Sequence, residues 1–290
     1  MIYSPLRYPG GKRKLAPFIG MLIEEYGHKG GTYIEPFAGG AAVAIELLEK
    51  KIVSRIVIND LDKGVYSFWR AILTETDRFV EEIERVPLSV EEWNTQHDIC
   101  MNLTSKYSFE LGFATFYMNR TNRSGIIKGG VIGGKNQRGF WKMDARFNKI
   151  ELINRIRRIA SMKHEIHLYN QEIERFLSDY INRFGNDVFV YFDPPYFNQG
   201  KQLYLNFFRY EDHIRIERLI NERVNYDWII TYDDVPQIEE IYQRYCVKKF
   251  EIRYSAAKKR KANEIIVFKN QSMVPSSELM KHNNLKITLS

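Results

Sequence analysis

Two stretches of the chain alternate between candidate strands and candidate helices, and this alternation limits the fold more than any other feature. A short strand at 32–36 leads through a glycine turn and a helix to a second strand at 55–58. The alternation resumes at residue 166 and ends in two strands, 247–254 and 264–268, which we expect to pair as an antiparallel hairpin. The pattern predicts an α/β protein built on one doubly wound sheet.

The segment between these two stretches has a different character. Apolar residues recur at helical spacing over 65–85, 109–118 and 147–162, whereas 119–146 is rich in Gly, Arg, Lys and Asn and has little periodicity. We therefore expect an inserted, mostly helical domain. The predicted division is one domain made of 1–64 and 164–270, the inserted domain at 65–163, and a polar tail of uncertain order at 271–290.

Positive charge gathers inside the inserted segment. The whole chain has a net charge of +7, but residues 120–163 alone contain 12 Lys/Arg and 2 Asp/Glu. A basic segment within an otherwise slightly acidic protein indicates a polyanionic partner such as nucleic acid. A solvated helix face is the alternative for the helical part of this segment.

The composition gives little support to several other classes of protein. Cys100 and Cys246 lie far apart and the six histidines form no ligand motif, so we expect no metal and a reducing, cytoplasmic location. No apolar run approaches the roughly 18 residues that a membrane span requires.

The first candidate site is the turn after the strand at 32–36, which reads Glu35-Pro36-Phe37-Ala38-Gly39-Gly40. Glycines let a ligand approach the backbone closely, and a carboxylate at Asp60, after the next strand, can accept the hydroxyls of a ribose. The turn lacks the G-x-G-x-x-G pattern that holds a pyrophosphate. A nucleoside cofactor without a pyrophosphate, such as S-adenosylmethionine, therefore fits better than NAD. A turn without a ligand is the alternative.

The second candidate site is Asp193-Pro194-Pro195-Tyr196, directly after the apolar strand 188–192. Prolines make a stiff turn without N–H donors, so the Asp193 carboxylate and the Pro194 carbonyl can both accept hydrogen bonds from one amino group. Tyr196 offers a flat face on which a base can stack. An aromatic amine is a poor nucleophile because its lone pair is delocalised, and two acceptors favour its reactive, pyramidal form. A purely structural turn is the alternative.

Both motifs follow strands, and doubly wound sheets bind ligands beyond the carboxyl ends of their strands, where the strand order reverses. If the two strands are neighbours, we expect a cofactor and a base to meet there. The N-terminal arm, Pro5-Leu6-Arg7-Tyr8-Pro9-Gly10-Gly11-Lys12, resembles an incomplete phosphate loop. The alternatives are that Lys12 meets a carboxylate and that the arm is flexible.

A glycine-rich segment follows Asn119 and carries side chains of the kind that contact DNA bases and phosphates. A mobile surface loop is the alternative. The candidate DNA-binding residues are Arg120, Asn122, Arg123, Lys128, Lys135, Asn136, Gln137 and Arg138.

Taken in order, these residues resemble the Dam-like DNA adenine methyltransferases. The resemblance runs over about residues 4–269 and includes Pro9 to Lys12, Glu35 to Gly40, Asn59-Asp60, Asn119-Arg120, Asp193 to Tyr196, and Asn263-Glu264-Ile265-Ile266. It implies a Rossmann-like methyltransferase sheet and methyl transfer from S-adenosylmethionine to the N6 amine of adenine in double-stranded DNA, with S-adenosylhomocysteine as product. Such an enzyme must flip the adenine out of the duplex.

The resemblance also assigns roles to residues. Asp193, Pro194 and Tyr196 would hold the target adenine, and residues 65–163 would recognise the DNA target. A cognate restriction endonuclease is a candidate partner. The cofactor would lie against Tyr8, Gly11, Lys12, Glu35, Phe37, Gly39, Gly40, Asp60 and Asp193.

Two features depart from the family pattern. Asn170-Gln171 stand where members often have Asp-Phe to hold the cofactor adenine, and the recognition loop differs from that of GATC-reading members, so we do not predict GATC. The alternatives are methylation of RNA adenine, of cytosine N4 or of a protein glutamine, and a catalytically silent DNA-binding relative. Asp193 weighs against cytosine and glutamine, whose enzymes more often carry Ser or Asn there. Intact Asp193 and Tyr196 weigh against the silent relative.

Overall fold

The computed structural model describes residues 3–7, 12–103, 105–198, 208–254, 260–285 and 287–290. Its centre is a seven-stranded sheet in the order β3-β2-β1-β4-β5-β7-β6. The first five strands pair in parallel, and β7 runs antiparallel to both β5 and β6. The predicted α/β fold and closing hairpin are confirmed. The strands are β1 Thr32–Glu35, β2 Arg55–Asn59, β3 Ile166–Tyr169, β4 Val188–Phe192, β5 Asp227–Asp233, β6 Cys246–Tyr254 and β7 Arg260–Phe268.

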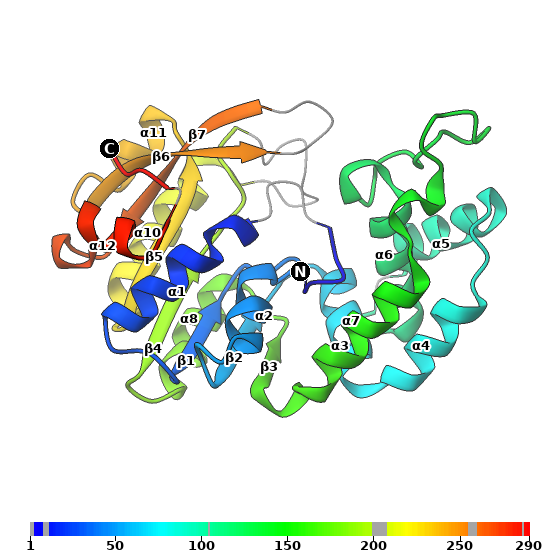
Figure 1. Ribbon diagram of the computed structural model, residues 1–290, viewed down its shortest axis with the longest axis horizontal. Coiled ribbons are helices and arrows are strands. Elements are labelled where there is room, and N and C mark those ends of the chain that lie inside the picture. Colours follow the sequence, from blue (N-terminus) through cyan, green and yellow to red (C-terminus); the bar gives the residue numbers. More distant parts are fainter. Residues whose placement is uncertain (1–2, 8–11, 104, 199–207, 255–259, 286) are drawn as a thin grey trace.

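Helices cover both faces of the sheet (Figure 1). In β4, Phe189 and Tyr191 pack in the same buried cluster as α1 and α2, whereas Val188, Val190 and Phe192 pack in a second cluster with α8, α10 and α11. A strand buried on both faces reads as an uninterrupted apolar run, which is why β4 carries no charged residue. These helices are α1 Ala16–Glu25, α2 Ala42–Glu49, α8 Ile173–Asp179, α10 Tyr210–Arg223 and α11 Pro236–Ile241.

The chain inserts a second lobe of helices between β2 and β3, on the right of Figure 1. Helix α3 packs against α6 in this lobe and also against β3, and one buried apolar cluster continues from the sheet into the helical lobe. Because the same apolar core runs through both parts, it does not mark where one domain ends and the other begins. The predicted domain boundaries after residues 64 and 163 therefore stay predictions. The helices are α3 Lys63–Thr74, α4 Thr76–Arg85, α5 Val90–Asn102, α6 Phe109–Thr121 and α7 Lys149–Ser161.

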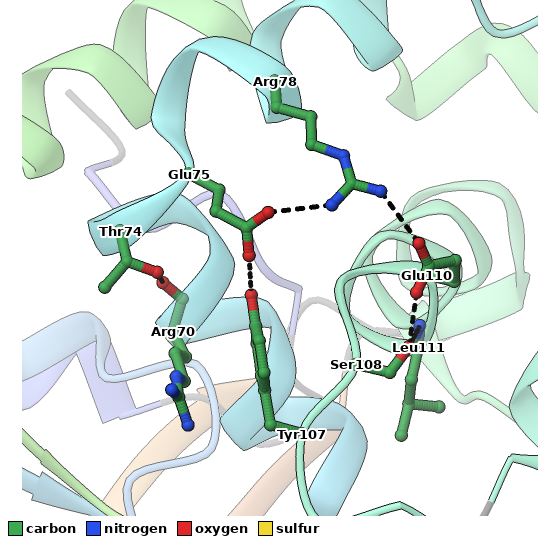
Figure 2. Close-up of polar contacts among 8 residues, drawn as sticks. All are labelled: Arg70, Thr74, Glu75, Arg78, Tyr107, Ser108, Glu110 and Leu111. Atoms are coloured by element: carbon green, nitrogen blue, oxygen red, sulfur yellow. Dashed lines mark hydrogen bonds and ion pairs between the residues drawn. The ribbon is translucent and has the colours of Figure 1, made fainter.

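The apolar pattern predicts one helix over 65–85, but the structure has two, which meet at Glu75 with φ −128° and ψ 40°. Figure 2 shows the contacts that hold this break. Glu75 accepts hydrogen bonds from the Tyr107 hydroxyl and from Arg78 (2.8 Å), and Arg78 also donates to Glu110 in α6 (2.8 Å). These contacts tie the junction to a loop and a helix distant in sequence, so the local spacing of apolar residues does not reveal it.

The C-terminal residues are more ordered than predicted. After β7 the chain forms the short helix α12, Ser277–His282, and buries the side chains of Met273 and Met280. Ser290 and Lys249 of β6 exchange backbone hydrogen bonds of 2.9 and 3.0 Å. Burial of two methionine side chains anchors a segment whose composition is otherwise polar. Among the described residues, no helix has both the length and the apolar composition needed to cross a membrane.

Candidate active site

The motifs that follow β1 and β4 lie at the same edge of the sheet. The two strands are parallel neighbours, with Thr32 opposite Val188 and Ile34 opposite Val190. The strand order reverses between them, because β2 and β3 continue beyond β1 while β5 and the hairpin continue beyond β4. Open α/β sheets bind ligands at such a switch point. The neighbouring strands that a shared site requires are therefore present.

Glu35 ends β1 with a carboxyl group that is 5% exposed. Its Oε1 accepts hydrogen bonds from the Tyr33 hydroxyl (2.9 Å) and the Ala44 amide (3.1 Å). Burial raises the pKa of Glu35 to about 8, although these two hydrogen bonds oppose the rise. A buried carboxyl group at the end of a strand favours a cationic partner beside it.

The glycine turn has an unusual backbone conformation. Gly39 and Ala41 have φ of 47° and 44°, a region that glycine adopts freely. The Gly39 N–H donates to Asp60 Oδ2 (2.7 Å), and the Gly39 carbonyl accepts from the Trp69 indole (2.9 Å). These bonds tie the turn to the end of β2 and to α3.

Phe37 and Gly40 flank this turn. Phe37 is half-buried, and its ring centre lies 6.1 Å from that of Phe208. The Gly40 carbonyl accepts a hydrogen bond from the hydroxyl of Ser4 on the N-terminal arm (2.5 Å). The arm therefore packs against the turn. Tyr8 and Gly11, two further predicted cofactor residues, lie outside the described residues.

Asp60 follows β2, and both of its carboxylate oxygens accept backbone hydrogen bonds. Oδ2 binds the Gly39 amide, and Oδ1 binds the Asp62 amide (2.9 Å). Burial, followed by the charge of Asp62, raises the pKa of Asp60 to about 7. The Asn170 amide donates to the carbonyls of Asp60 (2.7 Å) and Leu61 (3.1 Å). Asn170, which departs from the family pattern, thus braces the loop that carries Asp60.

Lys12 lies at the centre of a buried charged cluster and is 5% exposed. Its Nζ is 3.6 Å from Asp193 Oδ1, 3.6 Å from Glu264 Oε1 and 4.5 Å from the centre of the Tyr196 ring. The Tyr196 hydroxyl donates to Glu264 Oε2 (2.9 Å). One ammonium, two carboxyl groups and one aromatic ring therefore meet beyond the end of β4, together with the buried Pro194.

Burial disfavours charge on both carboxyl groups of this cluster. It raises the pKa of Asp193, while the Lys12 ammonium and the Thr231 hydroxyl, which donates to Oδ1 (3.0 Å), oppose the rise. Burial also raises the pKa of Glu264 to about 7, with Lys12 again opposing. Neighbouring carboxyl groups with perturbed pKa values are a physical mark of a functional site.

Three residues that hold this cluster had no predicted site role: Thr231, Asp233 and Glu264. Asp233 of β5 lies opposite Glu264 of β7 in the sheet register. Its carboxylate accepts hydrogen bonds from the amides of Phe197 and Asn198, both 2.9 Å, directly after the Asp-Pro-Pro-Tyr turn. The available signals for Glu264 were its place in the Asn263-Glu264-Ile265-Ile266 element and its position before a run of apolar residues.

Comparison with known proteins identifies the family. Residues 8–260 match the family of D12 class N6 adenine-specific DNA methyltransferases. The chain belongs to this family. The family and the adenine-specific DNA methyltransferase activity predicted from the sequence are thereby confirmed.

Two curated relatives agree with this assignment at low identity. The chain is 24% identical over 204 residues to the type II methyltransferase M.MjaIII of Methanocaldococcus jannaschii, covering 66% of this chain and 68% of the relative. It is 25% identical over 285 residues to the type II methyltransferase M1.LlaDCHI of Lactococcus lactis subsp. cremoris, covering 90% of this chain and 93% of the relative.

Among solved structures, one rRNA methyltransferase resembles this methyltransferase only loosely. The rRNA methyltransferase AviRa of Streptomyces viridochromogenes has a TM-score of 0.39 and 10% identity, covering 89% of this chain and 88% of that chain. This likeness adds nothing to the sheet topology described above.

In this DNA methyltransferase, the predicted DNA-binding residues divide into an exposed and an enclosed group. Arg123, Lys128, Lys135, Asn136 and Arg138 are exposed on the segment between α6 and α7. Four of them are cations, and the Lys135 ammonium lies 5.4 Å from the centre of the Trp93 ring. They stay candidates for contact with DNA.

Asn122 and Gln137, which were also predicted to bind DNA, make hydrogen bonds within the chain. Asn122 is 0% exposed. Its amide accepts from the Trp93 indole (2.7 Å) and donates to the carbonyls of Ile126 (3.0 Å) and Ile127 (2.9 Å). The half-buried Gln137 side chain likewise bonds to backbone on both sides of its own loop. Because their polar groups are used within the chain, both amides shape the loop, and a contact of either one with DNA stays a prediction.

Arg120 is also enclosed, with 9% exposure at the end of α6. Its Nη1 donates to the Pro5 carbonyl (3.4 Å), and its Nε has no hydrogen-bond partner among the described residues. Burial lowers the pKa of Arg120 to about 9, and the like charges of Arg7, Arg155 and Arg146 lower it further. These four arginines form a group where the N-terminal arm meets α6 and α7. We call it the arginine group.

Proposed function

We propose that this methyltransferase transfers the methyl group of S-adenosylmethionine to the N6 amine of an adenine flipped out of double-stranded DNA. S-adenosylhomocysteine is the product. The observation that carries the proposal is the meeting of Asp193, Tyr196 and Lys12 beyond β4, next to the strand that ends in Glu35. S-adenosylmethionine supplies a methyl group on a positively charged sulfur, so the enzyme needs no covalent intermediate.

Asp193 is the residue that activates the amine in this proposal. Its Oδ1 is oriented by the Thr231 hydroxyl, which is itself 2.8 Å from the hydroxyl of Tyr191. A carboxylate and the Pro194 carbonyl that accept the two N6 hydrogens draw the amine out of conjugation with the ring. The negative charge of Asp193 also stabilises the positive charge that develops on N6. N6 then loses a proton, which Asp193 can receive.

Glu264 and Lys12 balance the charge of the site. When an amine approaches Asp193, the Lys12 ammonium can stay paired with Glu264 and leave Asp193 to the amine, because Lys12 is 3.6 Å from each carboxyl group. Glu264 also fixes the Tyr196 hydroxyl, so the Tyr196 ring keeps its place when a base stacks on it. We therefore assign positioning roles to Glu264 and Lys12.

The residues that follow β1 and β2 suit the remaining parts of the cofactor. Both hydrogen bonds that Glu35 receives within the described residues use Oε1, so Oε2 suits the ammonium of the methionine part. The Gly39 and Gly40 backbone allows close approach, Phe37 offers an apolar face, and Asp60 suits the ribose hydroxyls. Tyr8 and Gly11 belong to the same proposed site.

The inserted lobe suits the phosphates of double-stranded DNA. Guanidinium groups bind phosphate oxygens in pairs, and an anion at the arginine group would offset the repulsion among Arg7, Arg120, Arg146 and Arg155. The N6 amine of a stacked adenine is inaccessible, so the base must leave the duplex to reach Asp193. The exposed cations of the lobe support this substrate.

A partner forms a further part of the proposal. The curated relatives M.MjaIII and M1.LlaDCHI carry type II names, which supports a cognate restriction endonuclease that cleaves the sequence this enzyme methylates. The pair would act in the cytoplasm, on the DNA of the nucleoid.

Methyl transfer from labelled S-adenosylmethionine to duplex DNA tests the proposal. We expect Asp193→Ala to abolish transfer while calorimetry still detects cofactor binding, because Asp193 contacts the amine. A matched control is Asp98→Ala, which removes a carboxylate that is 73% exposed on α5 and should leave the rate unchanged. Turnover by Asp193→Ala at the wild-type rate would exclude the proposed site.

A further inference from the structure

Two aromatic side chains of the inserted lobe stand in solvent. Phe140 is 90% exposed and Trp141 is 65% exposed, and they are the only aromatic residues among the large apolar side chains that the described part of the chain exposes. Their rings pack edge to face, with centres 5.0 Å apart and planes at 86°. Exposed aromatic side chains placed side by side mark a surface that binds a partner.

The loop that carries this pair is braced from within. Both of its ends are buried, at Val131 and Met143, each 3% exposed. The Gly139 amide donates to the Gly133 carbonyl (3.1 Å), and a side-chain Cβ at Gly139 would lie only 2.8 Å from the Gly133 Cα, so glycine is required for this closure.

The side chain of Gln137 completes the brace. It donates to the carbonyls of Ile132 (2.9 Å) and Gly134 (2.7 Å), and it accepts from the Met143 amide (3.0 Å). The loop therefore presents Phe140 and Trp141 from a fixed frame, so ordering the loop on binding costs little entropy.

The surroundings of the pair are strongly basic. Lys135, Arg138 and Lys142 are exposed on the same loop, and residues 122–143 contain no Asp or Glu. Cations around an aromatic pair match the phosphate backbone and the base stack of a nucleic acid, whereas an apolar protein groove would leave the cations unpaired. Charge therefore favours DNA as the occupant.

We propose that Phe140 and Trp141 form an apolar wedge that stacks against bases of the DNA substrate, while Lys135, Arg138 and Lys142 bind the flanking phosphates. Proteins that open or bend a duplex insert such side chains at a base step. The inference rests on the proposed function and adds two base contacts that the predicted DNA-binding residues do not include.

The salt dependence of binding separates stacking from phosphate contact. Loss of a stacked ring lowers affinity by about 5- to 150-fold per base, but leaves the slope of log K against log salt unchanged. Loss of a phosphate contact reduces that slope by about 0.9. We therefore expect Phe140→Ala/Trp141→Ala to bind sheared genomic duplex DNA more weakly with the wild-type slope, and Lys142→Ala to reduce the slope.

Ile150→Ala and Trp141→Phe are the matched controls. Ile150 is 75% exposed on α7, so its truncation removes exposed apolar surface away from the loop and should leave affinity unchanged. Trp141→Phe keeps an aromatic ring and should retain most of the affinity.

The fluorescence of Trp141 reports the contact directly. Of the four tryptophans, Trp69, Trp93 and Trp228 are buried, so quenching of the exposed Trp141 by DNA should dominate the change in emission. Trp141→Phe should lose that change.

The wedge is overturned if the double alanine variant binds DNA as tightly as the wild type and DNA leaves the emission of the wild type unchanged. If the wild type still methylates DNA, that result leaves the proposed function intact. The wedge is also overturned if the double alanine variant keeps its affinity for DNA but changes from dimer to monomer in analytical ultracentrifugation, because the partner would then be a second copy. A wild-type chain that binds the cofactor and methylates no DNA would refute the proposed function itself.

Discussion

Replacement of Glu35 by Gln should stabilise the protein at neutral and alkaline pH. The pKa of Glu35 is about 8 in the folded protein, against an ordinary value of 4.5. The fold therefore favours the protonated form. This contribution to stability is complete below pH 4.5 and is lost as the pH rises through about 8. A glutamine stays neutral at every pH, and its carbonyl oxygen can keep both hydrogen bonds that Glu35 Oε1 accepts.

The size of the effect follows from the two pKa values. One pKa unit corresponds to about 1.4 kcal/mol, so a pKa that rises from 4.5 to about 8 lowers the free energy of unfolding of the wild type by about 5 kcal/mol above pH 9. At pH 7, where Glu35 is mostly protonated in the folded protein and ionised in the unfolded chain, the loss is about 3 kcal/mol. The group is 5% exposed, so solvent screening reduces this little. We expect Glu35→Gln to gain these amounts over the wild type, and no gain near pH 4.5.

Urea unfolding followed by circular dichroism, without cofactor and at several pH values, measures this difference. Glu46→Gln is a matched control, because Glu46 is also 5% exposed but is paired with Arg13 (3.0 Å) and Lys50 (2.7 Å). Removing its charge should destabilise the protein at pH 7. If Glu35→Gln and the wild type differ by the same amount at every pH, the buried carboxyl group is not the source of the effect. Calorimetry should show weaker cofactor binding by Glu35→Gln.

The remaining predictions concern catalysis and DNA binding. Asp193→Asn keeps an acceptor for the Thr231 hydroxyl but loses the charge, so kcat should fall by about 100-fold or more while cofactor affinity changes little; a fall in affinity alone would contradict this. In the wild type, kcat should rise as the pH passes about 7, because Glu264 is ionised and pairs with Lys12 only above its pKa of about 7. Glu264→Gln should lack this rise, and a pH profile that matches the wild type would exclude the role. Arg123→Ala or Arg138→Ala should weaken or relax DNA recognition, measured by affinity and target preference, and neither residue reads the DNA if both quantities stay unchanged.

Local patterns were sufficient to predict the strands. The strand predicted at 188–192 is β4, Val188–Phe192, and residue 166, where the alternation was predicted to resume, is the first residue of β3. A strand buried in a parallel sheet carries its signal in its own residues. The break at Glu75 depends instead on Tyr107 and Glu110, which lie on a later loop and helix. Helices α1 and α5 had no predicted counterpart.

The residues of the candidate site also divide into those that a local motif predicts and those that only the folded chain brings together. Asp193 and Glu35 could be found from the sequence, because each follows a strand within a short motif. Glu264 acts on Tyr196 across 68 positions of sequence, so only the pairing of β7 with β5 brings it into the site. Asn122 shows a different limit of the sequence. Its residue type suits base recognition, but the sequence does not reveal that its side chain is 0% exposed.

Base-resolved sequencing of genomic DNA from cells that express this chain, beside cells that express Asp193→Ala, tests directly whether the site methylates adenine. We expect N6-methyladenine in one short motif with the wild-type chain and none with the variant. Genomic DNA without N6-methyladenine, from cells that contain the folded, cofactor-binding chain, would contradict the central claim that Asp193 and its neighbours methylate adenine in DNA.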